Sequence, residues 1–147
     1  MVLDANLKLH DAIVNANSNG FSVTGSEGWI NLGRAGLPRG AQLFLSVPTL
    51  HADRELTATL QATYDNGSTI RTVAVLTVPT RAAGIIGRSK IMTVGVSQEA
   101  YLEGYERNNI DARVVITAPN HVNDANFGQV QVFLGVGEKG VGLGSDL

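Results

Sequence analysis

A chain of 147 residues, with 44% hydrophobic and 16% charged residues, is long enough to form one domain around a single core. Its formal net charge of −2 excludes a highly charged disordered chain. The chain also lacks the excess of basic residues that marks a nucleic-acid-binding domain. It has no cysteine, which excludes disulfides and thiolate metal sites.

The predicted elements are short strands separated by turn signals. Residues 1–9 read as an extended arm that leads into a first strand. Alternating or apolar runs then predict strands at 21–24, 29–32, 41–47, 56–64, 69–78, 89–96, 112–117 and 127–136. This spacing predicts an all-β chain, an antiparallel sandwich or barrel of about eight strands that occupies residues 10–136 as a single domain.

Two segments depart from the strand pattern. Residues 97–104 predict the one helix, because Ser97 is a candidate N-cap and acidic residues follow it, but Gly104 limits that helix to about two turns. Residues 137–147 contain four glycines and predict a flexible tail. No apolar run approaches the roughly 18 residues of a membrane span, and the first residues lack the features of a secretory signal, so we expect an intracellular product.

The clearest local pattern is a β-hairpin over residues 56–78. Asn66 and Gly67 suit a two-residue turn with positive φ values, which places Leu60 opposite Val73. One face of the hairpin then carries six apolar side chains and is expected to face the core: Leu56, Ala58, Leu60, Ala62, Val73 and Val75.

The opposite face of the hairpin is polar on its first strand and partly apolar on its second. Its apolar side chains include Ile70, Leu76 and Val78. An exposed apolar row on a strand is an aggregation hazard. We therefore expect another strand, layer or subunit to cover these three residues.

No motif predicts catalysis or a metal site. His10, His51 and His121 have no metal-ligand spacing. The carboxylate pairs Asp53 with Glu55, and Glu99 with Glu103, are the candidates for acid–base chemistry, but the sequence gives no sign that either is buried. We therefore expect no enzyme activity, no catalytic residue, no metal and no cofactor.

Two further groups of residues are open to more than one interpretation. The loop at 33–40 carries Arg34 and Arg39, which could hold an anion in a nest of amides, although a solvated connection or an inter-subunit contact is favoured. Trp29, Tyr101 and Tyr105 could form a stacking platform for sugars or belong to a core or subunit interface. A carbohydrate-binding β-sandwich, as a tail- or receptor-associated module, is therefore the alternative function.

Four stretches carry a resemblance to a known family. They are the entry Leu3-Asp4-x-x-Leu7-x-Leu9-x-Asp11-Ala12, the strand end Asn31-Leu32-Gly33, the strand from Ala41 to Val47, and the Thr/Ala-rich strand from Leu56 to Thr63. With these features the chain resembles the small jelly-roll cement, or decoration, proteins of tailed bacteriophage capsids. Residues 101–110 and the glycine-rich tail are not features of that family.

The resemblance implies a fold, a function and partners. It implies a jelly-roll-like sandwich that forms a homotrimer, binds the major capsid protein on the outside of the virion and bridges capsomers. Such a protein is made in the host cytoplasm and binds neither nucleic acid nor membrane. The expected interface residues are Leu3, Leu7, Leu9, Arg34, Arg39, Ile70, Leu76, Val78, Tyr101 and Tyr105.

Overall fold

The computed structural model describes residues 7–33, 41–80, 90–95, 110–119 and 123–136. These residues form nine strands: β1 (Lys8–Ala16), β2 (Phe21–Thr24), β3 (Ile30–Gly33), β4 (Ala41–Val47), β5 (Leu56–Thr63), β6 (Arg71–Val78), β7 (Lys90–Gly95), β8 (Ile110–Ala118) and β9 (Ala125–Val136). The predicted helix at 97–104 and the predicted tail at 137–147 lie outside the described residues.

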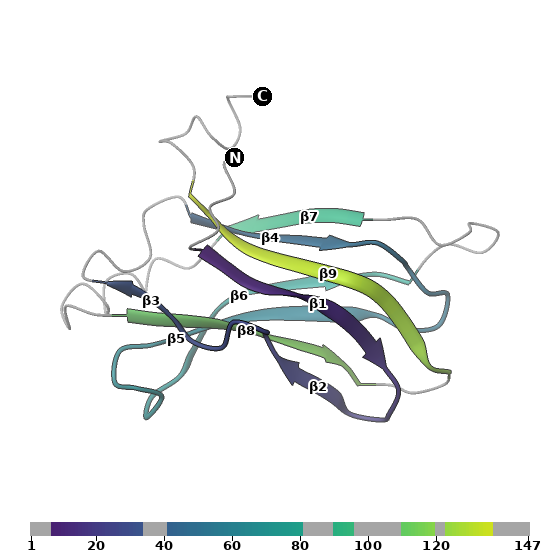
Figure 1. The fold of residues 1–147 in the computed structure, drawn as a ribbon, viewed down its shortest axis with the longest axis horizontal. Coiled ribbons are helices and arrows are strands. Elements are labelled where there is room, and N and C mark those ends of the chain that lie inside the picture. The colour runs from purple at the N-terminus through teal and green to yellow at the C-terminus, as the bar shows by residue number, and fades with distance from the viewer. Residues whose placement is uncertain (1–6, 34–40, 81–89, 96–109, 120–122, 137–147) are drawn as a thin grey trace.

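The strands form two antiparallel sheets that pack as a sandwich (Figure 1). Sheet A has the order β1-β9-β4-β7, and sheet B has the order β2-β8-β5-β6 with β3 also paired to β8. Because β2 and β3 pair with successive parts of β8, they fill one strand position together. The nine strands therefore occupy eight positions in two four-stranded sheets, which is the jelly-roll arrangement. The expectation of an all-β, jelly-roll-like sandwich is confirmed.

The core lies between the sheets and is built by strict alternation of side chains. In β4 and in β8, every second residue is buried and the residues between them are partly exposed. Leu43 and Leu45 of sheet A and Val114 and Ile116 of sheet B are 0% exposed. Since burial of such a side chain contributes about 1.5–3 kcal/mol, this shared layer is the main source of stability.

The break between β2 and β3 brings the edges of the two sheets together. At Gly25 the backbone N–H donates a hydrogen bond to the carbonyl oxygen of Val114 in β8, and that of Glu27 donates to the carbonyl oxygen of Leu9 in β1. A Cβ at position 25 would meet the Leu9 carbonyl oxygen and the Val114 side chain. Only glycine fits this close approach without a shift of its neighbours.

The hairpin of β5 and β6 corrects the predicted register. Ala62 pairs with Arg71 as expected, and Asn66 and Gly67 have positive φ values of 57° and 91°. Leu60, however, pairs with Ala74, because the register shifts by one residue between Leu60 and Gln61. Such a β-bulge places an extra residue in one strand and reverses the alternation beyond it.

The bulge changes which side chains of β6 face the core. Val75, expected in the core, is 49% exposed, whereas Leu76 and Val78 are 5% and 1% exposed. Val73 and Ala74 are both buried. The connecting loop is also wider than a two-residue turn, because pairing ends at Ala62 and the Asp65 carboxylate accepts a hydrogen bond from the backbone of Thr69 at 2.7 Å.

The start of the sandwich also differs from the prediction. β1 begins at Lys8, and Leu9 is 0% exposed within the core. Leu9 therefore belongs to the sandwich and is not part of an extended arm at residues 1–9.

Candidate functional site

The outer face of sheet A carries a pair of aromatic rings at its centre. Phe44 of β4 and Phe133 of β9 are directly paired across the two inner strands of the sheet. Their ring centroids lie 6.4 Å apart at an interplanar angle of 70°, an edge-to-face contact. Since the neighbours of both residues along their strands point into the core, the two rings lie on the surface and are partly exposed.

Amide and hydroxyl side chains surround this ring pair. Gln42 and Ser46 flank Phe44 on β4, and Gln131 precedes Phe133 on the same face of β9. On the adjacent strand β1, Ile13 is 65% exposed. On β1, Lys8 is paired directly with Phe133. Exposed aromatic side chains within a polar surround are typical of protein–protein interfaces.

The charges described on this face neutralise each other at its β1 edge. The ammonium group of Lys8 lies 3.9 Å from the carboxylate of Asp11. The same carboxylate accepts hydrogen bonds from the side-chain amides of Gln129 at 2.8 Å and Gln131 at 3.4 Å. The hydrogen bond from Gln129 is the main reason why the pKa of Asp11 is lowered. We refer to the surface made by Ile13, Gln42, Phe44, Ser46, Gln129, Gln131 and Phe133 as the phenylalanine face.

The outer face of sheet B has a different composition. Thr57 pairs with Thr77 on one side and with Thr117 on the other, which gives a row of hydroxyl groups across three strands. The next row places Thr59 between Val75 and Val115. We refer to the surface made by Thr57, Thr59, Val75, Thr77, Val115 and Thr117 as the threonine face. These two rows contain neither a charged nor an aromatic side chain.

At one end of sheet B, Trp29 is already in contact with an arginine. The guanidinium carbon of Arg113 lies 4.4 Å from the centroid of the Trp29 ring, a cation–π contact. The Nε of Arg113 also donates a hydrogen bond to the side chain of Gln61 at 2.9 Å. The guanidinium therefore covers one face of the indole, and a sugar cannot stack on that face. Tyr101 and Tyr105, the other two residues of the expected stacking platform, lie outside the described residues.

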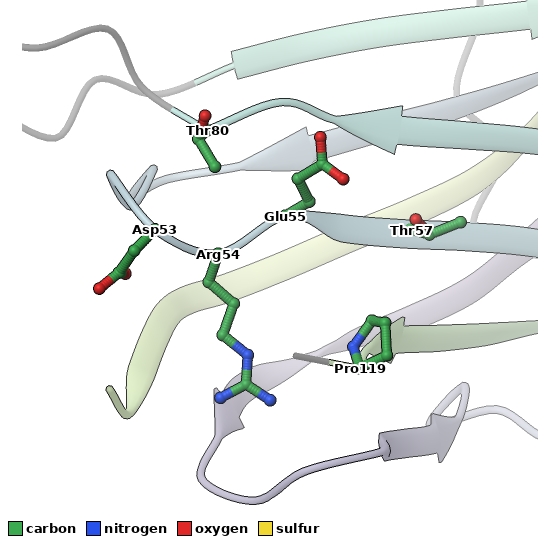
Figure 2. A pocket seen from close by; sticks show the side chains of 6 residues that line it. All are labelled: Asp53, Arg54, Glu55, Thr57, Thr80 and Pro119. Carbon is green, nitrogen blue, oxygen red and sulfur yellow. The ribbon is translucent and has the colours of Figure 1, made fainter. Parts of the chain in front are cut away.

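A pocket of about 280 Å³ opens where the chain enters β5 (Figure 2). It is lined by Asp53, Arg54, Glu55, Thr57, Thr80 and Pro119. Figure 2 shows the carboxylates of Asp53 and Glu55 pointing to different sides, with Arg54 between them along the chain. The Asp53 carboxylate accepts a hydrogen bond from the Asn123 side chain at 2.8 Å. The two carboxylates therefore do not form an acid–base pair.

Arg54, which lines this pocket, is hydrogen-bonded to backbone carbonyl groups. It is 2% exposed, and its terminal nitrogens donate hydrogen bonds to the carbonyl oxygens of Ala16 at 2.7 Å, Ser18 at 2.6 Å and Ala118. These carbonyls belong to the end of β1, the following turn and the end of β8. The guanidinium therefore joins segments from both sheets at one end of the sandwich, and this use accounts for its burial.

The described histidines also have local partners. The Nε2 of His51 lies 2.9 Å from the carbonyl oxygen of Asn126, and its ring packs edge-to-face on Phe127 at 4.8 Å. His10 bonds to Ser26 and Ala12, whereas His121 lies outside the described residues. Among the described residues, no group of three or more histidine or acidic side chains is placed to hold a metal ion.

The expected interface residues have very different environments. Leu9, Leu76 and Val78 lie in the chain's own core, so the layer that covers Leu76 and Val78 is the opposing sheet. Leu7 is half-buried against that core, and Ile70 is 41% exposed beside the β5–β6 loop. The remaining expected residues lie outside the described part of the chain: Leu3, Arg34, Arg39, Tyr101 and Tyr105.

Sequence reasoning missed the phenylalanine face and Arg54. A signal for the first was present, because Phe44 alternates with Leu43 and Leu45 and must point away from them in a strand. The apolar run from Leu43 to Leu45 hides this alternation, although Gln42 and Ser46 mark the face of Phe44 as the more polar one. No signal distinguishes Arg54 from a solvated arginine, because its partners are carbonyl groups far away in the sequence.

Comparisons with known proteins give little further information. No protein-family model matches the chain, and no curated protein matches it. Among solved structures the chain is similar to Eiger TNF from S. frugiperda, with 8% sequence identity, over 86% of this chain and 94% of that chain, at a TM-score of 0.31. The fold assignment rests on strand order and pairing, not on this likeness. In the described residues, no helix has the length and hydropathy needed to cross a membrane.

Proposed function

We propose that this chain is a structural protein of a tailed-phage virion, a decoration protein that binds the outer capsid lattice as a homotrimer and bridges capsomers. The observation that carries the proposal is the phenylalanine face, a surface with the composition of an interface on a jelly-roll scaffold. The sequence resemblance to capsid cement proteins supports the same function. The proposed partners are the major capsid protein and further copies of this chain, and the proposed location is the exterior of the capsid.

The scaffold suits a role in binding more than one in catalysis. The two terminal nitrogens of Arg54 donate hydrogen bonds to backbone carbonyls, and the carboxylates of Asp53 and Glu55 diverge. A decoration protein needs a stable body and several contact surfaces, and the outer faces of the two sheets offer such surfaces. We accordingly propose that the chain is not an enzyme.

The proposed mechanism is avidity. Each copy makes modest contacts with the shell, and a trimer presents three linked copies, so the second and third contacts form at a high effective concentration. In this proposal residues 1–6 add a contact with a neighbouring capsomer.

Co-sedimentation with phage shells tests this function. The purified full chain is mixed with shells assembled from the major capsid protein, and the pellet is analysed for both proteins. We expect saturation at a fixed ratio to the shell protein and greater resistance of the decorated shells to heat. A chain that leaves the shells unbound and instead binds a glycan on an array would overturn the proposal in favour of the carbohydrate-binding alternative.

A truncation tests the role of the N-terminal residues. A chain that starts at Leu7 retains the whole of β1, including the buried Leu9, and should fold as the full chain does. We expect it to bind shells more weakly than the full chain. Unchanged shell binding by the folded truncation would assign attachment to the sandwich alone.

A further inference from the structure

We propose that Asn66, in the loop between β5 and β6, is a site of spontaneous deamidation, and that the hydroxyl group of Thr63 sets its rate. This inference is independent of the proposed function. Asparagine is followed by glycine twice in the chain, at Asn19-Gly20 and at Asn66-Gly67. Both asparagines are exposed. The two sites differ in what holds the glycine nitrogen, and this difference selects Asn66.

The reaction needs only the two adjacent residues and water. The backbone nitrogen of Gly67, after loss of its proton to hydroxide, attacks Cγ of the Asn66 side chain. A five-membered cyclic imide forms as the bond from Cγ to the side-chain nitrogen breaks, and ammonia leaves with a proton from water. Water then opens the imide at either carbonyl carbon, which gives aspartate or isoaspartate and adds one negative charge. Glycine favours the attack because it has no Cβ beside the nitrogen.

The folded loop restrains this nitrogen through Thr63. The backbone N–H of Gly67 donates a hydrogen bond to Oγ1 of Thr63 at 2.9 Å, and that hydroxyl donates to the carboxylate of Asp65 at 2.8 Å. Thr63 is 2% exposed, so its hydroxyl has little freedom to turn towards solvent. The Gly67 nitrogen must leave this hydrogen bond before it can lose its proton and attack.

The opening that releases Gly67 is local. Its acceptor lies four residues away in the same connection, and the pairing of β5 with β6 ends at Ala62 and Arg71. The loop can therefore open without the loss of a strand pair. Openings confined to a loop cost less free energy than the separation of paired strands. Deamidation at Asn66 can consequently proceed while the sandwich stays folded.

The nitrogen of Gly20 is held by the sheet itself. Its N–H donates to the carbonyl oxygen of Pro119 at 2.7 Å, beside the first residue pair of β2 and β8. In the same two segments, the buried Arg54 donates hydrogen bonds to the carbonyl oxygens of Ser18 and Ala118. Release of Gly20 therefore requires the end of β8 to separate from the turn before β2, and Asn19 is protected.

The products change the surface of the β5–β6 loop. Asn66 has a φ of 57°, a conformation that asparagine tolerates better than most residues. In isoaspartate the chain runs through the side chain, which adds a methylene group to the backbone and alters the turn. Aspartate keeps the backbone but places a second carboxylate beside Asp65. The loop is thus expected to become more negative as the protein ages.

The first experiment compares the two asparagines in one wild-type sample. The full chain is kept in mildly alkaline buffer, with or without urea, and digested with trypsin at intervals for mass spectrometry. Cleavage after Arg54 and Arg71 releases peptide 55–71, in which Asn66 is the only asparagine. In urea, both Asn-Gly sites should react at similar rates. In the folded chain, Asn66 should react about tenfold faster than Asn19 or more.

Two results of this experiment would overturn the proposal. One is a folded chain in which Asn19 reacts as fast as Asn66. The other is a folded chain in which Asn66 stays intact while the chain in urea is fully converted. Anion-exchange chromatography provides the control: a new acidic species should accumulate in the wild type but not in Asn66→Gly, which tolerates the positive φ.

The second experiment tests the role of Thr63. Thr63→Val removes the hydroxyl group with little change of shape and should accelerate the reaction at Asn66 about fivefold, which corresponds to one hydrogen bond. Ile116→Val, in the core of β8, lowers the overall stability without a change in the loop and should leave this rate unchanged. An unchanged rate in Thr63→Val, or equal acceleration in both variants, would exclude control by Thr63.

A third variant decides the question if Thr63→Val does not fold. Asp65→Ala removes the carboxylate that accepts hydrogen bonds from the Thr63 hydroxyl and from the Thr69 backbone. It should therefore loosen the same loop and accelerate deamidation at Asn66, with Asn19 unaffected. A folded Asp65→Ala variant that reacts at the wild-type rate would contradict the proposal.

Discussion

The backbone N–H of Ser26 donates a hydrogen bond to Nδ1 of His10 at 3.0 Å. Because Nδ1 accepts this bond, the proton of the neutral ring lies on Nε2, which is 3.2 Å from the carbonyl oxygen of Ala12. His10 is 3% exposed, and burial lowers its pKa from the ordinary value of 6.5, against smaller raising effects of Ala12, Asp11 and Glu27. The neutral ring thus joins β1 to the turn between β2 and β3.

We expect the free energy of unfolding to decrease as the pH falls below 6.5. The unfolded chain takes up a proton on His10 at its ordinary pKa, while the folded chain still holds the ring neutral, so acid favours the unfolded state. The slope is at most about 1.4 kcal/mol per pH unit and ends at the folded-state pKa. Urea unfolding between pH 7.5 and 5 should show this slope in the wild type and in His51→Gln, but not in His10→Gln. An identical slope in His10→Gln would contradict the assignment.

Two carboxyl groups titrate in a separate range. The Thr69 backbone N–H is the main cause of the lowered pKa of Asp65, and the Gln129 side chain is the main cause for Asp11. Both groups have an ordinary pKa of 3.8, and their contribution to stability is lost only as the pH falls below that value. Their titration therefore lies below the pH range of 7.5 to 5 in which the unfolding of the His10 variants is compared.

Replacement of Arg54 by alanine should be strongly destabilising. The change leaves the carbonyl groups of Ala16, Ser18 and Ala118 without their donor inside the fold. Since hydrogen bonds to charged groups contribute about 1.5–3 kcal/mol each, we expect a loss of about 3 kcal/mol or more in urea unfolding. The exposed Arg71 is the control, and Arg71→Ala should cost less than about 1 kcal/mol. Equal losses for the two variants would show that the buried contacts contribute little.

Gly25→Ala should be destabilising for a steric reason. The added Cβ would lie 2.6 Å from Cγ1 of Val114 and would also meet the backbone carbonyl of Leu9, which cannot move without disturbing β1. We expect a loss of about 2–3 kcal/mol, the cost typical of overpacking. At Gly20, where an added Cβ meets nothing within 4 Å but φ is +68°, Gly20→Ala should cost only about 1 kcal/mol. Thermal unfolding of the two variants compares these effects directly.

The bulge in β6 predicts opposite results for two adjacent residues. Leu76→Ala should cost about 2–5 kcal/mol because it opens a cavity in the core. Val75→Ala should change the stability by less than about 1 kcal/mol because that side chain is half-exposed. The unbulged register would reverse the order of the two losses. Chemical unfolding of both variants therefore tests the register in solution.

The strands were predictable where the side chains alternate and are flanked by turn residues. Residues 21–24 and 41–47 have the predicted bounds, and the positive φ values at Asn66 and Gly67 follow from local chemistry. The sheet order was not predictable in this way, because each strand chooses its partner by long-range packing. The bulge in β6 was not predictable for the same reason. The local preferences of Thr72, Val73 and Ala74 are compatible with either register.

The candidate site was less predictable than the fold. Exposure of Phe44 depends on which face of a largely apolar strand meets the opposite sheet, and burial of Arg54 depends on carbonyls from three distant segments. Leu76 and Val78 were expected on the outer face of the hairpin, but the one-residue shift at the bulge moves them into the core. The sequence therefore locates candidate surface residues reliably only where the register is known.

The pairing of β1 with β9 has a consequence for biosynthesis. Lys8 pairs with Phe133 and Ala16 with Ala125, so the first strand to leave the ribosome has its partner in the last strand described. Sheet A cannot close, and the phenylalanine face cannot form, until nearly the whole chain has been translated. Pairings between segments so distant in sequence are formed slowly.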